Sequence, residues 1–562
     1  MSRKSFINAA AISMVGLFLV RFLSIIYAPL ISMIIGGDST PAGALNAATN
    51  AIFNPFYELS LAGLPMAVAK LISTYNARED FDNSWRVYSL TSKVMMLLGI
   101  TAFAALFIFA EPLAAMALSS NQEGGVDISY AVASVRLMSV ALLFIPLLSG
   151  LRGYLQGFKT LLGVSVSQVI EQLVRIVVIL VIAFGITALM TGTVGHDTAT
   201  TNGIMYSFIG IAISVVAGMV AIYPFYRKLR KGHRRSRTLQ RRAGMLETRS
   251  NGELLREVLS IAIPFTLANL AAQGYTLITT YTFNSSMIAA GYSVDAAQSF
   301  YQIYTFWTEK LVTIPLTFAM AFSMVLITFI SSSLEQGKLK EVNRYILKCL
   351  QTVAFLTIAA TIGINLLAGP MYMMFYGFGD SVAIPILVAN SLRGLMFAFE
   401  VIIISILQGI NRKWHALVLS VGGPLIKLAL NHLLISLFGV YGDILATSIG
   451  LAFVVIVGFI VIVRTTKFPI WQFIKSLLLV IVNVAVMAVV IIAGEWLFNL
   501  VAPGFGTANR LNAFIYVVLF VIVGGGAYIL FADWTGILQI FFGPEMSIKQ
   551  IIGKIVRRLR RS

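Results

Sequence analysis

Residues 442–463 read GDILATSIGLAFVVIVGFIVIV, an apolar run of the length that a helix needs to cross the hydrocarbon core of a bilayer. Similar runs fill the chain, because 58% of its 562 residues are apolar and only 11% are charged, whereas about a quarter of an average soluble protein is charged. This composition excludes a soluble globular enzyme. Since lipid cannot satisfy free backbone N–H and C=O groups, the crossings must be helical. The sequence therefore predicts an all-α polytopic membrane protein.

Glycine, proline and charged clusters divide the chain into fourteen apolar stretches that are long enough to span the membrane. These predicted spans lie at 8–35, 46–75, 88–110, 129–151, 160–190, 204–225, 257–288, 299–333, 345–368, 383–408, 415–437, 442–463, 475–500 and 512–532. The first stretch continues past Arg21 without an obvious small-residue cleavage site, so we interpret it as a retained span rather than a signal peptide.

The basic excess, 41 Lys and Arg against 23 Asp and Glu, is concentrated in alternate loops. The basic loops contain Arg78, Arg86, Arg152, Lys159, Lys338, Lys340, Arg344, Arg412, Lys413, Arg464 and Lys467, together with the stretch 226–256. The intervening loops hold one basic residue, Arg510. By the positive-inside rule, this asymmetry places both termini in the cytoplasm of a cell-membrane protein. It also indicates that the net charge of +18 marks the cytoplasmic face of the membrane and is not a sign of nucleic-acid binding.

The chain carries signs of an internal repeat of six spans. Leu-Gln-Gly at 155–157 recurs at 407–409, and Glu58 in span two is echoed by Glu309 in span eight. Two six-span halves enter the membrane in the same direction, so we expect an axis along the membrane normal, a central cavity and alternating access. The predicted segments are an N-terminal six-helix bundle at 1–226, a basic cytoplasmic linker at 227–256, a second six-helix bundle at 257–464, two extra helices at 465–535 and a basic amphipathic tail at 536–562. The tail has the pattern of an interfacial helix on anionic lipids.

Ionisable residues inside the spans are the candidate site, because a charge at the bilayer centre costs about 2.5–3.5 kcal/mol and should face protein or water. Arg21 in span one and Lys310 in span eight could both face the cavity, and the alternative is burial against a carboxylate such as Glu58 or Glu309. Lys70 lies near the end of span two, where it can extend to water. A cavity lined by Arg and Lys suits a phosphate-bearing anion. We therefore predict these five residues as the substrate site.

One further pair has a structural interpretation. Glu171 and Arg175 stand at i and i+4 on one helix face, where they can neutralise one another.

The sequence has no Gly-x-x-x-x-Gly-Lys-Ser/Thr loop, no Cys/His metal spacing and no nucleophile motif. We accordingly expect a transporter without catalytic residues, metal or cofactor, driven by the substrate gradient, the membrane potential or a coupling cation such as Na⁺ or H⁺.

Several motifs resemble one family of transporters. Residues 307–311 (WTEKL), 314–315 (IP), 331–333 (SSS) and 369–370 (GP), with Arg344, resemble spans eight and nine of MurJ-type lipid II flippases. Residues 63–65 (GLP), 69–70 (AK), 75–77 (YNA), 152–157 (RGYLQG) and 167–175 (SQVIEQLVR) resemble the Gram-positive SpoVB/YtgP branch. The resemblance covers essentially the whole chain. It extends to the superfamily of multidrug/oligosaccharidyl-lipid/polysaccharide exporters.

The resemblance implies export of an undecaprenyl-diphosphate-linked glycan, most directly lipid II. Separately, we expect the protein to function as a monomer. In this family, basic residues of spans one, two and eight engage the diphosphate, and spans thirteen and fourteen form a groove for the lipid tail. Arg21 and Lys310 match by position and charge, whereas Tyr57 and Glu58 stand where span two would be basic. The family's cation site has only polar counterparts here. These are Asn269, Gln273 and Asn390.

Three other functions compete with this interpretation. The first is a flippase for another undecaprenyl-linked glycan, such as a teichoic acid, capsule or exopolysaccharide unit, which carries the same diphosphate. The second is a cation-coupled multidrug exporter, against which the central Arg21 argues because such a cavity should hold isolated carboxylates. The third is a membrane glycosyltransferase or polymerase, which would call for a large outward loop or a cluster of catalytic acids.

Overall fold

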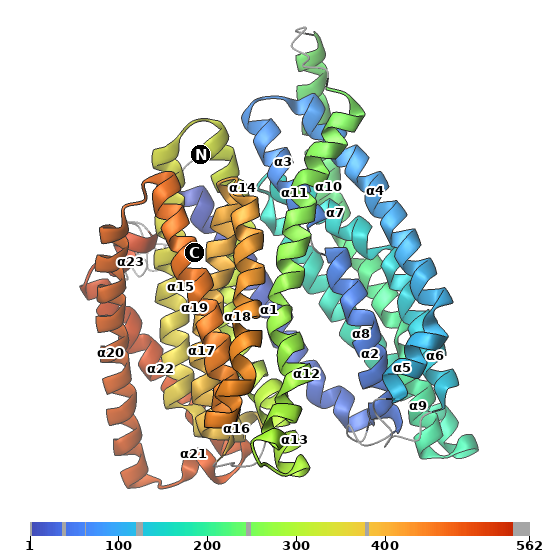
Figure 1. The fold of residues 1–562 in the computed structure, drawn as a ribbon, viewed down its shortest axis with the longest axis vertical. Helices are drawn as coiled ribbons and strands as arrows, with labels where there is room; N and C mark the ends of the chain where they lie inside the picture. The colour runs from blue at the N-terminus through green and yellow to red at the C-terminus, as the bar shows by residue number, and fades with distance from the viewer. Residues whose placement is uncertain are drawn as a thin grey trace, which may run out of the picture. The chain divides into compact units, whose positions relative to one another are not determined.

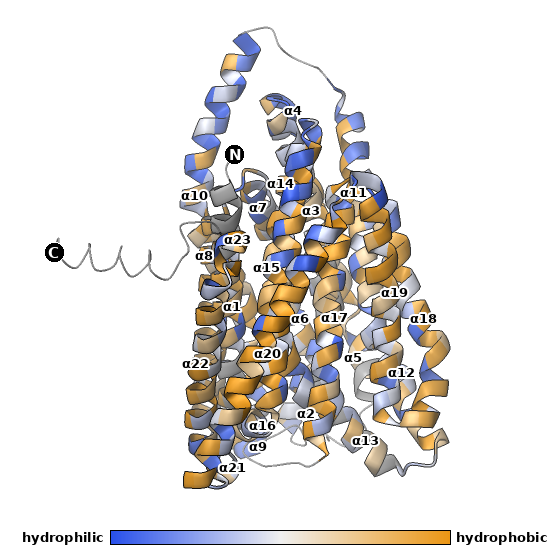
Figure 2. Ribbon diagram, turned by 90° about the vertical axis from the view of Figure 1, so that its left-hand side faces the viewer, coloured by the Kyte–Doolittle hydropathy of each residue, from blue (hydrophilic) through white to orange (hydrophobic). Residues whose placement is uncertain are grey.

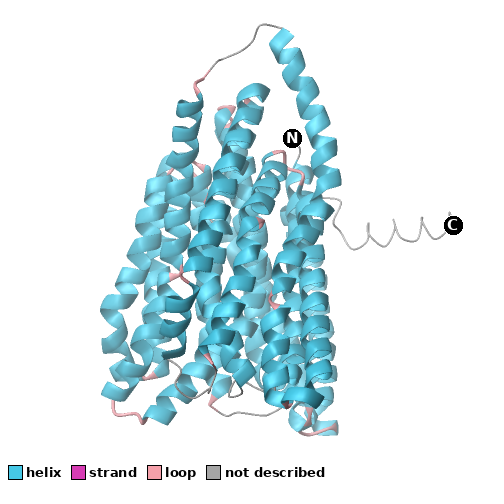
Figure 3. Cartoon of the chain, turned by 90° about the vertical axis from the view of Figure 1, so that its right-hand side faces the viewer, coloured by secondary structure: helices cyan, strands magenta, loops and turns pink. Residues whose placement is uncertain are grey.

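The computed structural model describes residues 3–35, 41–61, 63–119, 127–242, 249–376 and 382–542, and their regular structure is entirely helical (Figure 3). Within these residues, twelve helical segments are long and apolar enough to cross a membrane, and a shorter apolar segment occupies Ile12–Ser24. Each of the fourteen predicted spans coincides with helix. The predicted all-α polytopic membrane fold is therefore confirmed.

The chain divides into two compact units, which are described separately. Unit 2 contains residues 9–270 and 331–337. Its helices are α1 (Arg3–Ile35), α2 (Pro41–Leu61), α3 (Leu64–Ala77), α4 (Phe81–Ile108), α5 (Ala110–Ser119), α6 (Ile128–Ser139), η1 (Val140–Leu143), α7 (Ile145–Gly157), α8 (Leu161–Val194), α9 (His196–Ser207), α10 (Ile209–Arg242) and most of α11 (Asn251–Ala272) (Figure 1). Helix α8 packs against α9 and α10, and α3 packs against α4 and α7.

Unit 1 contains most of the remaining chain, from Ala271 onwards. Its helices are α12 (Gly274–Ala289), α13 (Val294–Gln302), η2 (Ile303–Thr308), α14 (Glu309–Glu335), α15 (Leu339–Leu366), α16 (Ala368–Tyr376), α17 (Ala383–Gly409), α18 (Lys413–Phe438), α19 (Val440–Thr466), α20 (Ile470–Val501), α21 (Phe505–Ala508), α22 (Arg510–Trp534) and α23 (Ile537–Phe542). Helix α19 packs against both α17 and α18, and α12 packs against α18. The five segments predicted from the sequence stay a prediction.

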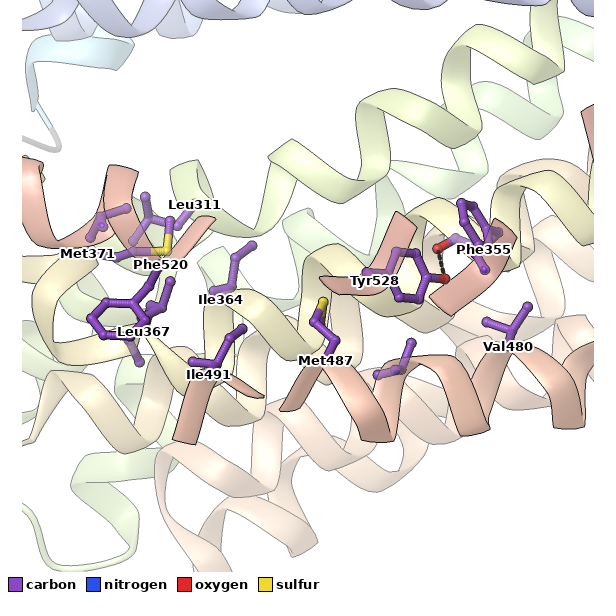
Figure 4. Close-up of a cluster of buried hydrophobic side chains, with 14 of the residues drawn as sticks. Leu311, Phe355, Ile364, Leu367, Met371, Val480, Met487, Ile491, Phe520 and Tyr528 are labelled. Carbon is purple, nitrogen blue, oxygen red and sulfur yellow. Dashed lines mark hydrogen bonds between the residues drawn. The ribbon is translucent and has the colours of Figure 1, made fainter. Parts of the chain in front are cut away.

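The last two long helices pack against the rest of unit 1 through a buried apolar cluster. Met487 and Ile491 of α20 and Phe520 of α22 belong to the same cluster as Ile364 of α15 (Figure 4). At the other end of the cluster, the Tyr528 hydroxyl donates to the Phe355 carbonyl at 2.8 Å. Because lipid is as apolar as these side chains, close packing rather than exclusion of water favours this association.

Helix α10 continues without a break from its apolar part into the basic stretch 227–242, which we call the basic arm (Figure 2). Lys, Arg, Leu and Gln are good helix formers, and α10 has no proline after Pro224. This part of the predicted linker 227–256 is therefore helical. The C-terminal residues 543–562, on which most of the predicted amphipathic tail falls, lie outside the described residues.

Candidate functional site

A π-helical turn, η2, stands immediately before the predicted site residues of unit 1. It covers Ile303–Thr308, and α14 begins directly after it at Glu309. Such turns are rare and occur frequently at functional sites, because the wider turn reorients the side chains around it. Here the turn brings Tyr304 and Thr308 into a buried polar region, where their exposed fractions are 4% and 0%.

Glu309 is bound by α17. The Arg393 guanidinium forms an ion pair with the Glu309 carboxylate, and Arg393 Nε also donates to Asn390 Oδ1 at 2.6 Å. The amide of Asn390 donates to Thr308 Oγ1 at 2.8 Å and to Glu309 Oε2 at 3.3 Å. The Arg393 side chain is 11% exposed and that of Glu309 is 39% exposed. Glu309 is therefore a positioned carboxylate at the edge of a buried network.

A second ion pair is completely buried between α18 and α19. Lys427 Nζ lies 3.0 Å from Asp443 Oδ2, and the two side chains are 1% and 0% exposed. The ammonium also donates to the Tyr275 carbonyl at 3.0 Å and to the Thr279 hydroxyl of α12. Three acceptors thus match the three donors of the ammonium, which is the condition for burying such a charge.

Tyr304 lies between the two ion pairs. Its ring centre is 5.8 Å from Arg393 Cζ, and its hydroxyl interacts with Asp443. We call the four ionisable residues Glu309, Arg393, Lys427 and Asp443 the charged network. Its two acids and two bases balance, so the network as a whole brings no net charge into the membrane-spanning part of unit 1.

The predicted site residues fall into different environments. Lys310 is exposed on the first turn of α14, next to Glu309. Arg21 is exposed on α1 of unit 2, so the alternative that it is buried against a carboxylate is wrong. Glu58 lies on α2, but its side chain falls outside the described part of the chain.

Lys70 differs from the prediction. It was expected to extend to water, but it is only 5% exposed, with Nζ 5.7 Å from the centre of the Phe265 ring. The prediction was wrong because α3 is a short helix packed on both α4 and α7, and the neighbouring Ala69 and Leu71 are buried as well. An ammonium over an aromatic face is stabilised by the ring quadrupole.

The predicted Glu171–Arg175 pair is present in unit 2 and is larger than expected. Glu171 pairs with Arg175 on the same helix and also with Arg152 of α7, whose Nη2 lies 2.7 Å from Glu171 Oε2. Arg152 additionally donates to Ser167 Oγ at 2.8 Å. The sequence interpretation assigned Arg152 to a loop and therefore missed this contact.

Asp443 is the main functional candidate that the sequence interpretation missed. It is the second residue of the stretch 442–463, and it was not among the predicted site residues. Asn390 was recognised only as a polar candidate for a cation site, and the structure shows it bonded to Arg393, Thr308 and Glu309. The available signal was an acidic residue inside the boundaries of an apolar run.

Comparisons of the sequence with known proteins show the family to which the chain belongs. Residues 7–334 match the family described as polysaccharide biosynthesis protein. The chain is 32% identical to the lipid II flippase MurJ of Bacillus subtilis (strain 168) over 537 residues. The matched region covers 94% of this chain and 95% of that protein. The chain is 24% identical over 464 residues to stage V sporulation protein B of the same organism, covering 81% and 83% of the two chains.

Solved structures share the fold at low identity. The crystal structure of MATE in complex with MaD3S superposes with a TM-score of 0.67 and 14% identity, covering 83% of this chain and all of the other. A MOP superfamily transporter from Pyrococcus furiosus superposes with a TM-score of 0.63 and 14% identity, covering 83% and 99%. At this identity the likeness concerns the arrangement of helices alone.

Proposed function

The chain belongs to the family of polysaccharide biosynthesis proteins, as a relative of the lipid II flippase MurJ, and from this premise we propose that it moves lipid II from the inner to the outer leaflet of the cell membrane. It is a multi-pass membrane transporter of lipid-linked glycans and not an enzyme. The observation that carries the proposal of lipid II is the 32% identity to MurJ, because it extends over 94% of one chain and 95% of the other.

The exposed cations support a diphosphate ligand. Arg21 and Lys310 are exposed on helices that correspond to predicted spans one and eight. Guanidinium and ammonium groups form charge-assisted hydrogen bonds to phosphate oxygens, and these are about twice as strong as neutral ones. In the proposed site these two residues bind the diphosphate, while the charged network fixes the start of α14 from which Lys310 extends.

The transport step requires no chemistry on the substrate. The lipid tail stays in the bilayer along α20 and α22, while the headgroup crosses as the two repeats alternate between inward-open and outward-open states. If the termini and the basic loops are cytoplasmic, the negative interior favours outward movement of the anionic headgroup by about 2.3 kcal/mol per charge per 100 mV. The protein acts as a monomer in this scheme, with its basic C-terminal segment on anionic lipids and no role for nucleic acid.

The experiment that tests this function is depletion of the protein in its native host, followed by mass spectrometry of lipid-linked intermediates. We expect lipid II to accumulate on the cytoplasmic side. Accumulation of a different undecaprenyl-linked glycan would favour the second candidate function, a flippase for a teichoic acid, capsule or exopolysaccharide unit. That candidate is supported by the description of the matching family and by the likeness to stage V sporulation protein B.

A further inference from the structure

The basic arm has one face that is attached to the rest of unit 2. Asp82 of α4 forms ion pairs with both Arg237 and Arg241. One turn earlier on the same face, His233 donates to the Phe81 carbonyl at 2.9 Å. Because these contacts involve side chains as well as backbone and are spread over two turns, they fix the arm against α4 along one side.

The opposite face of the arm carries cations without partners. All are exposed, and none forms an ion pair, a hydrogen bond or a ring contact through its side chain within the described part of the chain. They are Arg227, Lys228, Lys231, Arg234, Arg235 and Arg242. At about 100° per residue they fall within an arc of about 120° around the helix, and at 1.5 Å per residue they extend over about 22 Å. We call these six residues the free stripe.

Holding the free stripe in line is unfavourable for the arm itself. Lys231 stands three residues before Arg234 and four residues before Arg235 and after Arg227, and like charges at these spacings destabilise a helix. The positive-inside rule requires only that a loop contain the charges. It does not account for contacts that hold them in one row. The arrangement therefore points to an anionic partner that lies along the stripe.

The described part of the chain does not supply this partner. Five acids of unit 2 near the basic loops have partners elsewhere, namely Asp80, Asp82, Glu253, Glu257 and Glu335. Glu247, in the segment after the arm, lies outside the described residues, and one carboxylate balances only one charge of the six. A second copy would bring the same stripe, and the C-terminal segment 543–562 is itself basic. Like charge repels both, so the partner is a different molecule.

A membrane surface fits only the base of the free stripe. The arm continues α10 away from its apolar part (Figure 2), and the headgroup layer on one side of a bilayer is about 5–7 Å thick. Even at a tilt of about 40°, near the upper end for membrane helices, the stripe rises by about 17 Å. Arg235 and Arg242 therefore lie beyond the headgroups.

Single-stranded nucleic acid fits the free stripe poorly. Proteins that bind it combine cations with aromatic rings on which the bases stack. The aromatic neighbours of the arm are on its attached side, where Arg230 Cζ lies 5.1 Å from the centre of the Trp85 ring and 5.9 Å from that of Tyr226. A protein segment that carries carboxylates remains as the partner.

The spacing of the cations matches a helix in particular. Lys228, Lys231, Arg235 and Arg242 follow one another at intervals of three, four and seven residues, the intervals through which two helices meet side by side. Leu239, one turn after Arg235, is 57% exposed and offers an apolar contact at the edge of the stripe.

We propose that the free stripe is a docking surface for an acidic helix of another protein on the predicted cytoplasmic side of the membrane. That helix carries Asp or Glu at intervals of three and four residues over about four turns, the length from Lys228 to Arg242. The arm is fixed before the partner arrives, so docking does not have to order it. This inference goes beyond the transport of lipid II and does not depend on it.

The first test is photo-crosslinking of the full-length protein in its native host. A benzophenone amino acid replaces Thr238, which is exposed, uncharged and within the arc of the free stripe. We expect an adduct with a protein, and mass spectrometry should find Asp or Glu at three- and four-residue intervals in the crosslinked segment. The matched control is the same amino acid at Leu339, which is 49% exposed at the start of α15 and should not give this adduct.

Four results of the crosslinking overturn the proposal. They are an adduct with phospholipid or RNA alone, an adduct with a second copy of this chain, an adduct with a protein segment that lacks the acidic spacing, and no adduct above the Leu339 control.

The second test measures binding of a synthetic peptide to the protein in nanodiscs of neutral lipid. The probe is a four-turn helical peptide with glutamates on one face, and a peptide of the same composition in scrambled order is its control. Lys231→Glu/Arg235→Glu should weaken binding of the patterned peptide by about tenfold. Lys340→Glu/Arg412→Glu, which reverses two exposed cations of unit 1, should leave it unchanged. Equal binding of the patterned and scrambled peptides overturns the proposal.

Leu239→Ala separates docking from general attraction between charges. It leaves the charge of the arm unchanged and should still weaken binding of the patterned peptide by about threefold, because an apolar contact is lost. The side chain is more than half exposed, so this variant should fold normally. It keeps the proposal testable if the charge reversals lower the melting temperature. Unchanged binding by Leu239→Ala overturns docking of a helix along this face.

Transport in proteoliposomes that contain purified lipid II separates this proposal from the proposed function. No other protein is present there, so Lys231→Glu/Arg235→Glu should move lipid II at the wild-type rate. A reduced rate would show that the free stripe acts on the substrate or on the membrane, and it overturns docking. Wild-type protein that moves no lipid II overturns the proposed function, while the crosslinking and peptide results still decide on the docking surface.

Discussion

Lys427 and Asp443 form an ion pair that is closed to solvent, with Nζ 3.0 Å from Oδ2 and exposed fractions of 1% and 0%. Removing one partner would leave a buried charge, so we expect Lys427→Met to lower the free energy of unfolding by about 3–5 kcal/mol. The double variant Lys427→Met/Asp443→Asn should lose less than the sum of the two single losses. Thermal unfolding of the detergent-purified protein measures this. The control is Arg78→Met, which breaks an exposed pair with Glu335 and should cost less than about 1 kcal/mol.

Arg21→Ala and Lys310→Ala should each reduce lipid II transport at least about tenfold, since a hydrogen bond to a charged group contributes about 1.5–3 kcal/mol. Complementation of a depleted host measures activity, and an immunoblot of the membrane fraction checks insertion. Lys93→Ala, at an exposed lysine of α4, is the control and should complement fully. Complementation by both Arg21→Ala and Lys310→Ala at wild-type level would remove the proposed diphosphate site.

Gly450→Ala should destabilise unit 1, because a Cβ at this position would lie 2.5 Å from the carbonyl oxygen of Gly423 and the backbone cannot easily yield. Overpacking of this kind costs about 1–3 kcal/mol. Gly525→Ala on α22 is the matched control: no atom lies within 4 Å of its Cβ, so alanine should be neutral or stabilising by up to about 1 kcal/mol. Equal melting temperatures for the two variants would contradict the described packing of α18 and α19.

Asp82→Asn should release the basic arm from α4. Asp82 Oδ1 accepts from Arg237 Nη2 and from Arg241 Nη2, each at 2.8 Å, and the neutral amide would lose both ion pairs. Hydrogen–deuterium exchange of residues 227–242 should become faster. The control is Asp197→Asn, at an exposed carboxylate in the first turn of α9. Unchanged protection of the arm in Asp82→Asn would show that the two ion pairs do not hold it.

His233 should make the attachment of the arm pH-dependent. Nε2 must donate to the Phe81 carbonyl at 2.9 Å, so Nδ1 of the neutral ring accepts from the Tyr154 hydroxyl at 2.7 Å. Burial lowers the pKa of His233, the Phe81 hydrogen bond opposes this shift, and the charge of Arg237 adds to it. His233 lies in the basic arm, beyond the apolar stretch 204–225.

The sign of the effect follows from the lowered pKa. The unfolded arm binds a proton near the ordinary histidine pKa of about 6.5, so the stability of the folded arm is full above that pH and falls as the pH drops below it. The protection factors of the arm's amides, which are exchange rates corrected for the intrinsic pH dependence of amide exchange, should therefore fall between about pH 7.5 and pH 5.5 in wild type. This fall should be absent in His233→Gln and retained in His415→Gln, at an exposed histidine.

The sequence predicted the features that depend on a single helix. Hydropathy is a local property, so all fourteen stretches coincide with helix, and the pair of Glu171 and Arg175 follows from their spacing on α8. The resemblance of motifs likewise led to the correct family, because the motifs lie within short segments of chain.

Features that join different helices could not be predicted. Glu309 is bound by Arg393 from α17, and Glu171 is bound by Arg152 from α7. Periodicity indicates which face of a helix is polar, but it does not indicate which other helix meets that face. For the same reason the burial of Lys70 against Phe265 was missed, since the two residues are far apart in the sequence.

The attachment of the basic arm has a practical consequence for imaging. A protein of 61.2 kDa embedded in a detergent belt offers few features by which single particles can be aligned. The arm is a continuous extension of α10, fastened at His233, Arg237 and Arg241 to α4 and α7. A helical fusion partner or an epitope joined in helical register after Arg242 would be held rigidly through the arm. It would therefore provide a feature by which unit 2 can be oriented in electron micrographs.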